Sequence, residues 1–314
     1  MPFHHTRERP LIFGLSSGEK LASKVCKILG GKLGTRVLTR FPSGEILTFP
    51  VEPTENRDVY IIQSTSPPVD ENLMDLLIFI DALKQSKAKS ITCIIPYFGY
   101  ARQDRAYRPG EPVTRNLIVR LLSGAGCDRI LAFELHSPLN SEPSTYKLES
   151  VSLMPLLADA IKKDIDSAPG DWIIVSPDRG GVRRARYVSD SLNIPLIVLD
   201  KRRDSEGNLI SMSLSEDVKG KHCFIVDDMI DTGSTALRAS EALQKSGALS
   251  VSLAAVHPVF SGGAVQNLMK ADLDHILVTD TIPIKPQDNN LDLTILSVAQ
   301  ILGETIERLQ SRKH

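Results

Sequence analysis

The chain has 314 residues, enough for two domains of ordinary size, and its formal net charge is −1 with 24% charged residues. That balance excludes the strongly basic surface with which a protein attracts nucleic acid or an anionic membrane. No apolar run approaches the roughly 20 residues of a membrane span, residues 1–10 lack a signal-peptide core, and the four cysteines are scattered, so we expect a cytoplasmic protein with reduced thiols.

The first half of the chain alternates short apolar runs with helical patterns. β-Branched and aromatic runs bounded by turn residues predict strands, and apolar residues three or four positions apart predict helices. On these grounds we predict strands at 10–14, 36–41, 58–63 and 90–95, and helices at 18–29 and 72–85. This alternation favours a mainly parallel sheet flanked by helices.

The same kind of pattern restarts near residue 150. We predict strands at 172–175, 195–199, 223–226 and 251–256, and helices at 153–165, 182–192 and 293–309. The last of these helices has apolar residues at helical spacing, and we expect it to pack on the N-terminal half. The sequence therefore predicts an α/β protein with two tandem domains, one of residues 8–150 with the C-terminal helix 293–312, and one of residues 151–292.

Two strand–helix–strand segments, one in each half, are similar in organisation. Val59–Gln63 and Ser90–Ile95 flank a helix in the first half, as Phe224–Asp228 and Ser250–Val256 do in the second. The first copy has Gln63-Ser64-Thr65 where the second has two adjacent carboxylates. We expect that the second half kept a binding chemistry and that the first became a scaffold supplying a different pocket.

The most informative stretch is residues 224–235. A buried apolar run ends in Asp227 and Asp228, and a helical pattern begins after a loop of small and hydroxyl residues, namely Asp231, Thr232, Gly233, Ser234 and Thr235. Backbone N–H groups and hydroxyls in such a loop, with the dipole of the following helix, bind phosphate. The two carboxylates would then face ribose hydroxyls or their metal ion. A surface turn with a helix cap is the alternative, but the whole string favours a sugar-phosphate site.

On these residues the chain resembles the ribose-phosphate pyrophosphokinase (phosphoribosyl pyrophosphate synthetase) family over nearly its whole length. The matching segments are Tyr100–Arg105, Glu134–Ser137, Val175–Asp178 with Gly180–Val182, Asp200–Arg203, Asp227–Thr235 and Thr279–Pro283. The resemblance implies two phosphoribosyltransferase-type domains. It also implies a reaction in which the 1-hydroxyl of ribose 5-phosphate attacks the β-phosphorus of Mg-ATP, giving 5-phosphoribosyl 1-diphosphate and AMP.

The resemblance also implies roles for individual residues on the sugar and metal side. The loop from Asp231 to Thr235 would bind the 5-phosphate, and Asp227 and Asp228 would take the ribose 2- and 3-hydroxyls. His136 and Asp178 match positions linked to Mg²⁺, although a histidine suits Mg²⁺ less well than oxygen ligands and fits better as a weak ligand or a phosphate contact. Lys201 and Arg203 match a catalytic flexible arm, and we expect the polar tract 204–208 to form a mobile lid.

On the nucleotide side, the resemblance assigns Arg102, Gln103 and Asp104 to ATP. Phe41, Ser43 and Glu45 would reach the adenine from a neighbouring subunit. Such sharing implies a homo-oligomer, which in the family is a hexamer built from dimers. ATP and ribose 5-phosphate are therefore the expected partners, with no nucleic acid and no membrane.

Several positions depart from the family pattern on the nucleotide side. Ser43 replaces an Asp or Asn, and three further positions that usually carry a cation hold Ala106, Gly110 and Asn116. Arg108 and Arg115 lie close in sequence as possible substitutes. The stretch 139–145 also replaces a glutamine and twin-phenylalanine segment without a change in length.

Three functions remain open at this point. The leading interpretation is a working, divergent synthetase, because Asp227, Asp228 and Lys201 are all retained. A second enzyme would keep the fold but act as a phosphoribosyltransferase on a base, or as a kinase on another ribose phosphate. The third is a non-catalytic regulatory subunit, which the loss of cations at Ala106 and Gly110 would favour.

Overall fold

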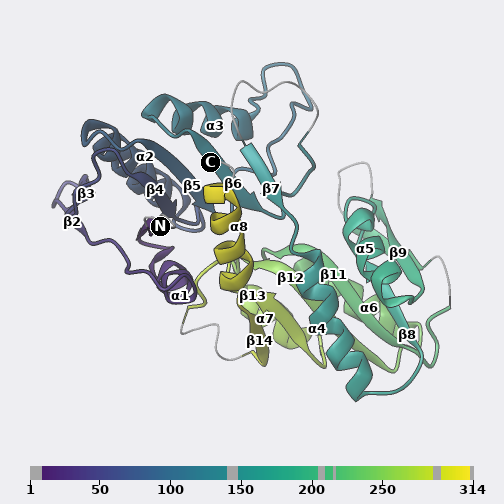
Figure 1. The fold of residues 1–314 in the computed structure, drawn as a ribbon. Helices are drawn as coiled ribbons and strands as arrows, with labels where there is room; N and C mark the ends of the chain where they lie inside the picture. The colour runs from purple at the N-terminus through teal and green to yellow at the C-terminus, as the bar shows by residue number, and fades with distance from the viewer. Residues whose placement is uncertain (1–8, 140–147, 204–208, 215–216, 286–290, 312–314) are drawn as a thin grey trace, which may run out of the picture. The chain divides into compact units, whose positions relative to one another are not determined.

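The computed structural model describes residues 9–139, 148–203, 209–214, 217–285 and 291–311. By the contacts between its residues, the chain divides into two compact units. The first consists of Met1–Val151 with Val298–His314, and the second of Ser152–Ser297. The strands of each unit form one main sheet of their own (Figure 1).

The first unit is built on a five-stranded parallel sheet in the order β1-β4-β5-β6-β7. The strands are β1 (Leu11–Gly14), β4 (Asp58–Ile62), β5 (Ser90–Ile95), β6 (Arg129–Phe133) and β7 (Leu148–Val151). The three central strands β4, β5 and β6 are buried almost without interruption. Both faces of this parallel sheet are therefore covered, as the continuous apolar runs of the sequence predicted.

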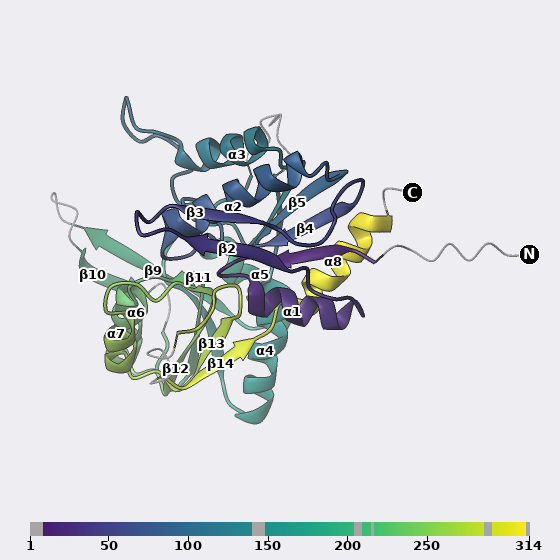
Figure 2. The ribbon, with the colours of Figure 1, turned by 90° about the vertical axis from the view of Figure 1, so that its left-hand side faces the viewer.

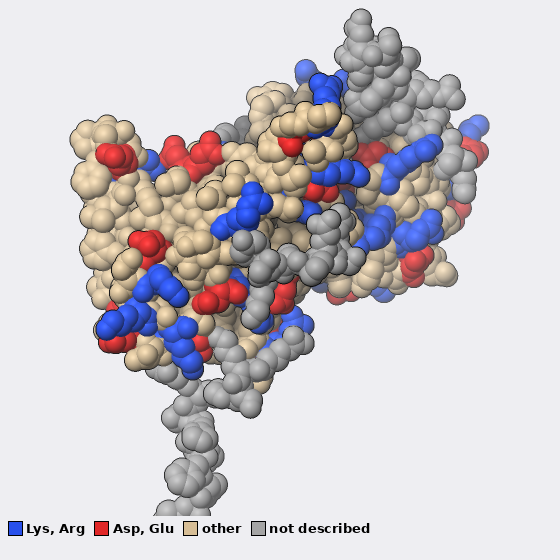
Figure 3. Space-filling model, turned by 90° about the horizontal axis from the view of Figure 1, so that it is seen from above, with Lys and Arg blue, Asp and Glu red and all other residues tan. Residues whose placement is uncertain are grey.

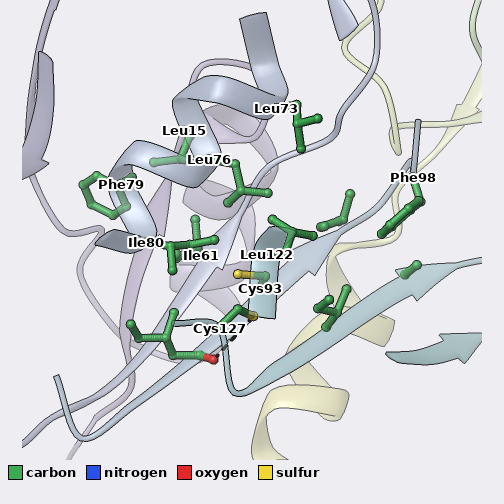
Figure 4. Packing of buried hydrophobic residues seen from close by; sticks show 14 of the residues in the cluster. Leu15, Ile61, Leu73, Leu76, Phe79, Ile80, Cys93, Phe98, Leu122 and Cys127 are labelled. Atoms are coloured by element: carbon green, nitrogen blue, oxygen red, sulfur yellow. Dashed lines mark hydrogen bonds between the residues drawn. The ribbon is translucent and has the colours of Figure 1, made fainter. Parts of the chain in front are cut away.

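The described residues of the first unit form four helices: α1 (Glu19–Ile28), α2 (Val69–Gln85), α3 (Thr114–Ala125) and α8 (Ala299–Ser311). Side chains of α2 and α3 meet alternate residues of the sheet in one apolar cluster, in which Phe79, Leu122 and Cys93 are fully buried (Figure 4). The amphipathic helices α1 and α8 pack against each other, and α1 also contacts β1 and β4.

A two-stranded antiparallel ribbon of β2 (Arg36–Arg40) and β3 (Ile46–Pro50) is attached to α2. An ion pair of 2.6 Å joins Arg36 Nη1 of the ribbon to Asp75 Oδ1 of the helix, and the two side chains are only 12% and 4% exposed. Arg36 Nη1 also donates to the buried Thr48 Oγ1 at 3.0 Å. Because these groups are buried and paired, they fix the ribbon to the helix.

The second unit is built on a seven-stranded sheet in the order β10-β9-β8-β11-β12-β13-β14. All pairs are parallel except β10 with β9. Strands β10 and β9 lie at one edge of this sheet (Figure 2). The strands are β8 (Trp172–Ser176), β9 (Leu196–Arg203), β10 (Leu209–Leu214), β11 (His222–Ile230), β12 (Ser250–Pro258), β13 (Ile276–Thr279) and β14 (Leu293–Leu296). The helices are α4 (Met154–Ser167), α5 (Val182–Leu192), α6 (Ser234–Lys245) and α7 (Ala264–Lys270).

The structure corrects three of the predicted elements. The predicted helix 293–309 is wrong at its start, because Leu293–Leu296 pairs with β13 as strand β14 and α8 begins at Ala299. The strand predicted at 195–199 continues to Arg203, paired with β10. The strand predicted to end at Val226 continues to Ile230 because β12 runs beside it. In each case a neighbouring strand supplies backbone hydrogen bonds that sequence periodicity does not show.

The surface agrees with the balanced composition. Lys and Arg side chains are interspersed with Asp and Glu on the face seen in Figure 3. Among the described residues, no helix is both long and apolar enough to cross a membrane.

Candidate functional site

The acidic pair lies on strand β11 itself. Asp228 is buried, and its Oδ2 lies 3.3 Å from Nη2 of Arg184 on α5, with both side chains at most 6% exposed. The backbone N–H of Asp228 donates to Asp227 Oδ1 at 2.8 Å. Removing one member of a buried ion pair leaves the other charge uncompensated, so Arg184 and Asp228 depend on each other.

Asp227 is in a different electrostatic environment from Asp228. Burial, the neighbouring Asp228 carboxylate and the Asp178 carboxylate raise the pKa of Asp227 well above its ordinary value. A carboxyl group in such a position favours a proton or a bound cation. The structure thus gives the two adjacent aspartates different partners, which the sequence did not predict.

The predicted phosphate loop connects β11 to the first turn of α6. Gly233 has φ = +72°, and an added Cβ would lie 3.1 Å from the carbonyl oxygen of Ala264, so a glycine is needed there. The hydroxyls of Thr232 and Ser234 lie 3.0 Å apart. These hydroxyls and the first N–H groups of a twelve-residue helix form the arrangement that binds a phosphate.

Two residues that sequence reasoning missed support this loop from α7 and the segment before it. Ser261 Oγ donates to Asp231 Oδ1, and its backbone N–H donates to the Asp231 carbonyl at 2.9 Å. Asn267 Nδ2 donates to the Thr232 carbonyl at 2.8 Å. These bonds hold the backbone of the loop in place at Asp231 and Thr232. In the sequence, the two glycines after Ser261 indicate a turn, but they do not indicate that Ser261 or Asn267 supports the phosphate loop.

Asp178 follows strand β8 and begins the turn into α5. Its Oδ1 accepts a hydrogen bond of 3.0 Å from the N–H of Gly181, the residue at the start of that helix. Asp178 is half-buried, and its charge acts on Asp227. Across the described residues, no group of three or more His, Cys, Asp and Glu side chains is arranged to hold a metal ion.

The residues predicted to contact ATP lie in the first unit, in the loop after β5. Arg102 and Gln103 are exposed, whereas the Asp104 side chain is 12% exposed and accepts a hydrogen bond of 2.6 Å from Ser137 Oγ. Burial pushes the pKa of Asp104 up, but the hydrogen bonds from Ser137 and from its own backbone and the nearby Arg115 hold it below its ordinary value. His136 is exposed in the adjacent turn.

The two possible cation substitutes in this loop have different environments. Arg108 is 86% exposed on its side chain, and its Nε lies 3.9 Å from Glu111 Oε1. Arg115 is only 5% exposed, and its Nη1 donates to Ser137 Oγ at 3.2 Å. The structure therefore does not present Arg115 as a surface cation, whereas Arg108 has that exposure.

The predicted adenine contacts occupy the turn of the β2–β3 ribbon. Phe41 is 44% exposed, and its backbone N–H bonds the Glu45 carbonyl at 2.8 Å. Ser43 Oγ donates to Glu45 Oε2 at 2.7 Å. Arg40 Nη1 reaches the Gly44 carbonyl at 3.2 Å. The turn is thus closed by its own hydrogen bonds and presents the Phe41 ring to solvent.

The predicted catalytic residues Lys201 and Arg203 lie on β9, opposite Met212 and Leu209 of β10. Their side chains lie outside what the structure describes, as does the predicted lid at 204–208.

Comparisons with known proteins match this chain from end to end. Residues 10–126 match the N-terminal domain of ribose phosphate pyrophosphokinase, and residues 153–288 match the phosphoribosyl transferase domain. The chain is 38% identical to ribose-phosphate pyrophosphokinase 1 of Lactococcus lactis over 96% of this chain and 93% of the relative. It is 40% identical to ribose-phosphate pyrophosphokinase of Agrobacterium fabrum over 95% and 96%.

One solved structure agrees with these sequence matches. The phosphoribosylpyrophosphate synthetase from Mycobacterium smegmatis is 35% identical, with a TM-score of 0.90 over 97% of this chain and 100% of that one.

Proposed function

The chain belongs to the ribose-phosphate pyrophosphokinase family, and we propose from this premise that its second unit binds ribose 5-phosphate at the end of β11. Enzymes of this family transfer the pyrophosphoryl group of ATP to the 1-hydroxyl of ribose 5-phosphate, giving 5-phosphoribosyl 1-diphosphate and AMP. This assignment rests on one observation: the acidic pair lies directly before the phosphate loop, and hydrogen bonds from Ser261 and Asn267 hold that loop.

In this proposal the loop Asp231–Thr235 holds the 5-phosphate through backbone N–H groups and the hydroxyls of Thr232 and Ser234. Asp227 accepts hydrogen bonds from the ribose hydroxyls. Asp228 keeps Asp227 in place through its backbone and is itself held by Arg184. The sugar is thereby oriented so that its 1-hydroxyl faces the incoming diphosphate, which is the main protein contribution to such a transfer.

The metal is expected to be Mg²⁺, with Asp178 and Asp227 as its protein ligands. The residues fit this ion, because the charge of Asp178 acts on Asp227, while the ion pair with Arg184 engages Asp228. Mg²⁺ prefers such oxygen donors and commonly uses one or two carboxylates together with substrate phosphates. When bound, the ion supplies charge stabilisation to the transferred diphosphate. The exposed His136 suits a phosphate contact better than a magnesium ligand.

On the nucleotide side we assign Arg102 and Gln103 to ATP, and Lys201 and Arg203 to the charge that develops during transfer. The exposed Arg108 is a further cation for this loop. The ring of Phe41, with Ser43 and Glu45, suits an adenine held across a subunit boundary, so we propose a homo-oligomer. All four cysteines are free and buried, which is consistent with a cytoplasmic location.

The test is an assay with ATP, ribose 5-phosphate and Mg²⁺ that detects AMP, run beside Lys201→Ala. We expect AMP formation at about one turnover per second or more, lost in the variant. Formation of ADP in place of AMP would show phosphoryl rather than pyrophosphoryl transfer and would overturn the proposal. Absence of both nucleotides, with ribose 5-phosphate still raising the Tm, would favour a regulatory subunit instead.

A further inference from the structure

A chain of three side chains connects separate parts of the first unit. Arg115 at the start of α3 donates from Nη1 to Ser137 Oγ at 3.2 Å, and Ser137 Oγ donates to Asp104 Oδ2 at 2.6 Å. The direction is fixed, since a guanidinium only donates, a carboxylate only accepts and a hydroxyl has one hydrogen to give. The loop after β5, the turn after β6 and helix α3 therefore meet at one set of bonds.

The same end of α3 also holds the residue before Asp104. The Arg115 backbone N–H donates to the Gln103 carbonyl at 3.1 Å, and Thr114 Oγ1 donates to Gln103 Oε1. The Gln103 N–H in turn donates to the Tyr100 carbonyl at 3.0 Å. Gln103 is thus held through its backbone and its side chain, and Asp104 through its side chain, immediately after the exposed Arg102.

Burial decides what Arg115 can do. At 5% exposed, the side chain is not presented to solvent, and its Nη1 is directed at Ser137. Arg120, one and a half turns further along α3, is exposed and provides the contrast. A buried guanidinium that donates along a chain of hydrogen bonds to a carboxylate stabilises one geometry of the segments it joins.

We propose that Arg115 and Ser137 are positioning residues for nucleotide binding, which lock Asp104 and so hold the Arg102–Gln103 loop against the His136 turn. Arg115 does not contact the triphosphate, and Asp104 acts through the loop rather than by touching ATP. The inference rests on the proposed function for its kinetic consequence, but the network itself is a feature of the first unit. The same network would thereby support Arg102 and Gln103, which we assign to ATP, and the turn that holds His136.

The kinetic test uses Ser137, because replacing a buried arginine can prevent folding. We expect Ser137→Ala to raise the KM for ATP about fivefold, with kcat and the KM for ribose 5-phosphate within about twofold of the parent. Ser137→Thr keeps the hydroxyl and should restore the parent KM. Arg120→Gln, which removes an exposed charge from the same helix, should change none of these values. An unchanged KM for ATP in Ser137→Ala would overturn the inference.

Hydrogen exchange separates this inference from the proposed function. We expect amide exchange in residues 100–116 to be at least about threefold faster in Ser137→Ala, because the N–H groups of Gln103 and Arg115 report on this loop. Ser137→Thr and Arg120→Gln should exchange like the parent. If the parent makes no AMP but Ser137→Ala still loosens this segment, the proposed function fails while the network stands. Unchanged exchange in Ser137→Ala would overturn the network itself.

Discussion

Strands β4 and β11 occupy equivalent places in the two units, and their ends differ in chemistry. Asp58 pairs with Ser90 between β4 and β5, as His222 pairs with Ser250 between β11 and β12. Counting from these pairs puts Gln63 at the place of Asp227. The sequence suggested that residues 59–63 correspond to residues 224–228. The strand register shifts this correspondence by one residue, so that residues 59–63 correspond to residues 223–227.

In the first unit, the chain's own side chains fill this position. Gln63 is fully buried; its Nε2 donates to the carbonyl and Oδ1 of Asn72, and its Oε1 accepts hydrogen bonds from the N–H and hydroxyl of Ser17 at 3.0 Å each. Ser64, at the place of Asp228, accepts the Tyr97 N–H at 3.1 Å. The polar groups of Gln63 and Ser64 are therefore satisfied by hydrogen bonds within the protein itself.

The helices that follow the two strands differ in the same sense. Helix α2 begins after Pro67 and Pro68, and proline has no N–H group to offer a phosphate. Helix α6 begins after Gly233 with Ser234 and Thr235, which supply both N–H groups and hydroxyls. The strand end of the second unit keeps carboxyl groups and is followed by hydroxyls and N–H groups at the start of a helix. This difference supports the proposal that the second unit binds the sugar phosphate.

The largest effect is expected at the buried ion pair between Asp228 at the end of β11 and Arg184 of α5. Asp228→Leu should lower the free energy of unfolding by about 3–5 kcal/mol, because it leaves Arg184 buried without this carboxylate. Gln63→Leu in the other unit should cost about 1–3 kcal/mol, the penalty for neutral groups. Urea unfolding measures both, and the double variant Asp228→Leu/Arg184→Leu should recover part of the loss. Equal losses of unfolding free energy in Asp228→Leu and Gln63→Leu would contradict the proposed difference between the two strand ends.

Two asparagines, one in each unit, allow a matched test of the hydrogen bond that supports the phosphate loop. Asn267 Nδ2 donates to the Thr232 carbonyl, and Asn72 Nδ2 donates to the Ser66 carbonyl, each at 2.8 Å. Asn267→Asp replaces the donor by an acceptor facing a carbonyl, and we expect the KM for ribose 5-phosphate to rise about fivefold. Asn72→Asp should cost about 1–2 kcal/mol of stability without changing that KM. A rise in KM from both variants would show a general effect on folding instead.

The pH dependence of stability tests the electrostatics of Asp227. Its pKa is higher folded than unfolded, so the folded state holds a proton that the unfolded state releases above about pH 4. Stability is therefore lost as the pH rises through this window. Asp227→Asn should raise the Tm by about 2–4 °C at pH 8, with a gain that shrinks towards pH 4. A gain independent of pH would show that the carboxylate is not the cause.

The smallest effect concerns Tyr60, whose equivalent in the second unit by register is Phe224. Tyr60 is 1% exposed, its hydroxyl has no hydrogen-bond partner among the described residues, and burial raises its pKa to about 12. Tyr60→Phe makes the first unit resemble the second at this point. We expect a change in unfolding free energy within about 1 kcal/mol, in the stabilising direction. A loss larger than this would reveal a partner for the hydroxyl.

Local chemistry made much of this protein predictable from its sequence. Strand, loop and helix are contiguous from Phe224 to the start of α6, so the order of residues alone indicated a phosphate loop and the two carboxylates before it. Buried parallel strands appeared as uninterrupted apolar runs, and their alternation with helices gave the α/β class. The repeat motifs also indicated two similar halves, of which only one kept the acidic pair.

The tertiary structure alone decided which groups support the site. Arg184 reaches Asp228 across 44 residues, Asn267 reaches Thr232 across 35, and Arg115 reaches Ser137 across 22. Periodicity reports which face of an element is buried, but it carries no information on which distant polar group meets it there. The same reason explains β14, since residues 293–296 are extended because β13 lies beside them.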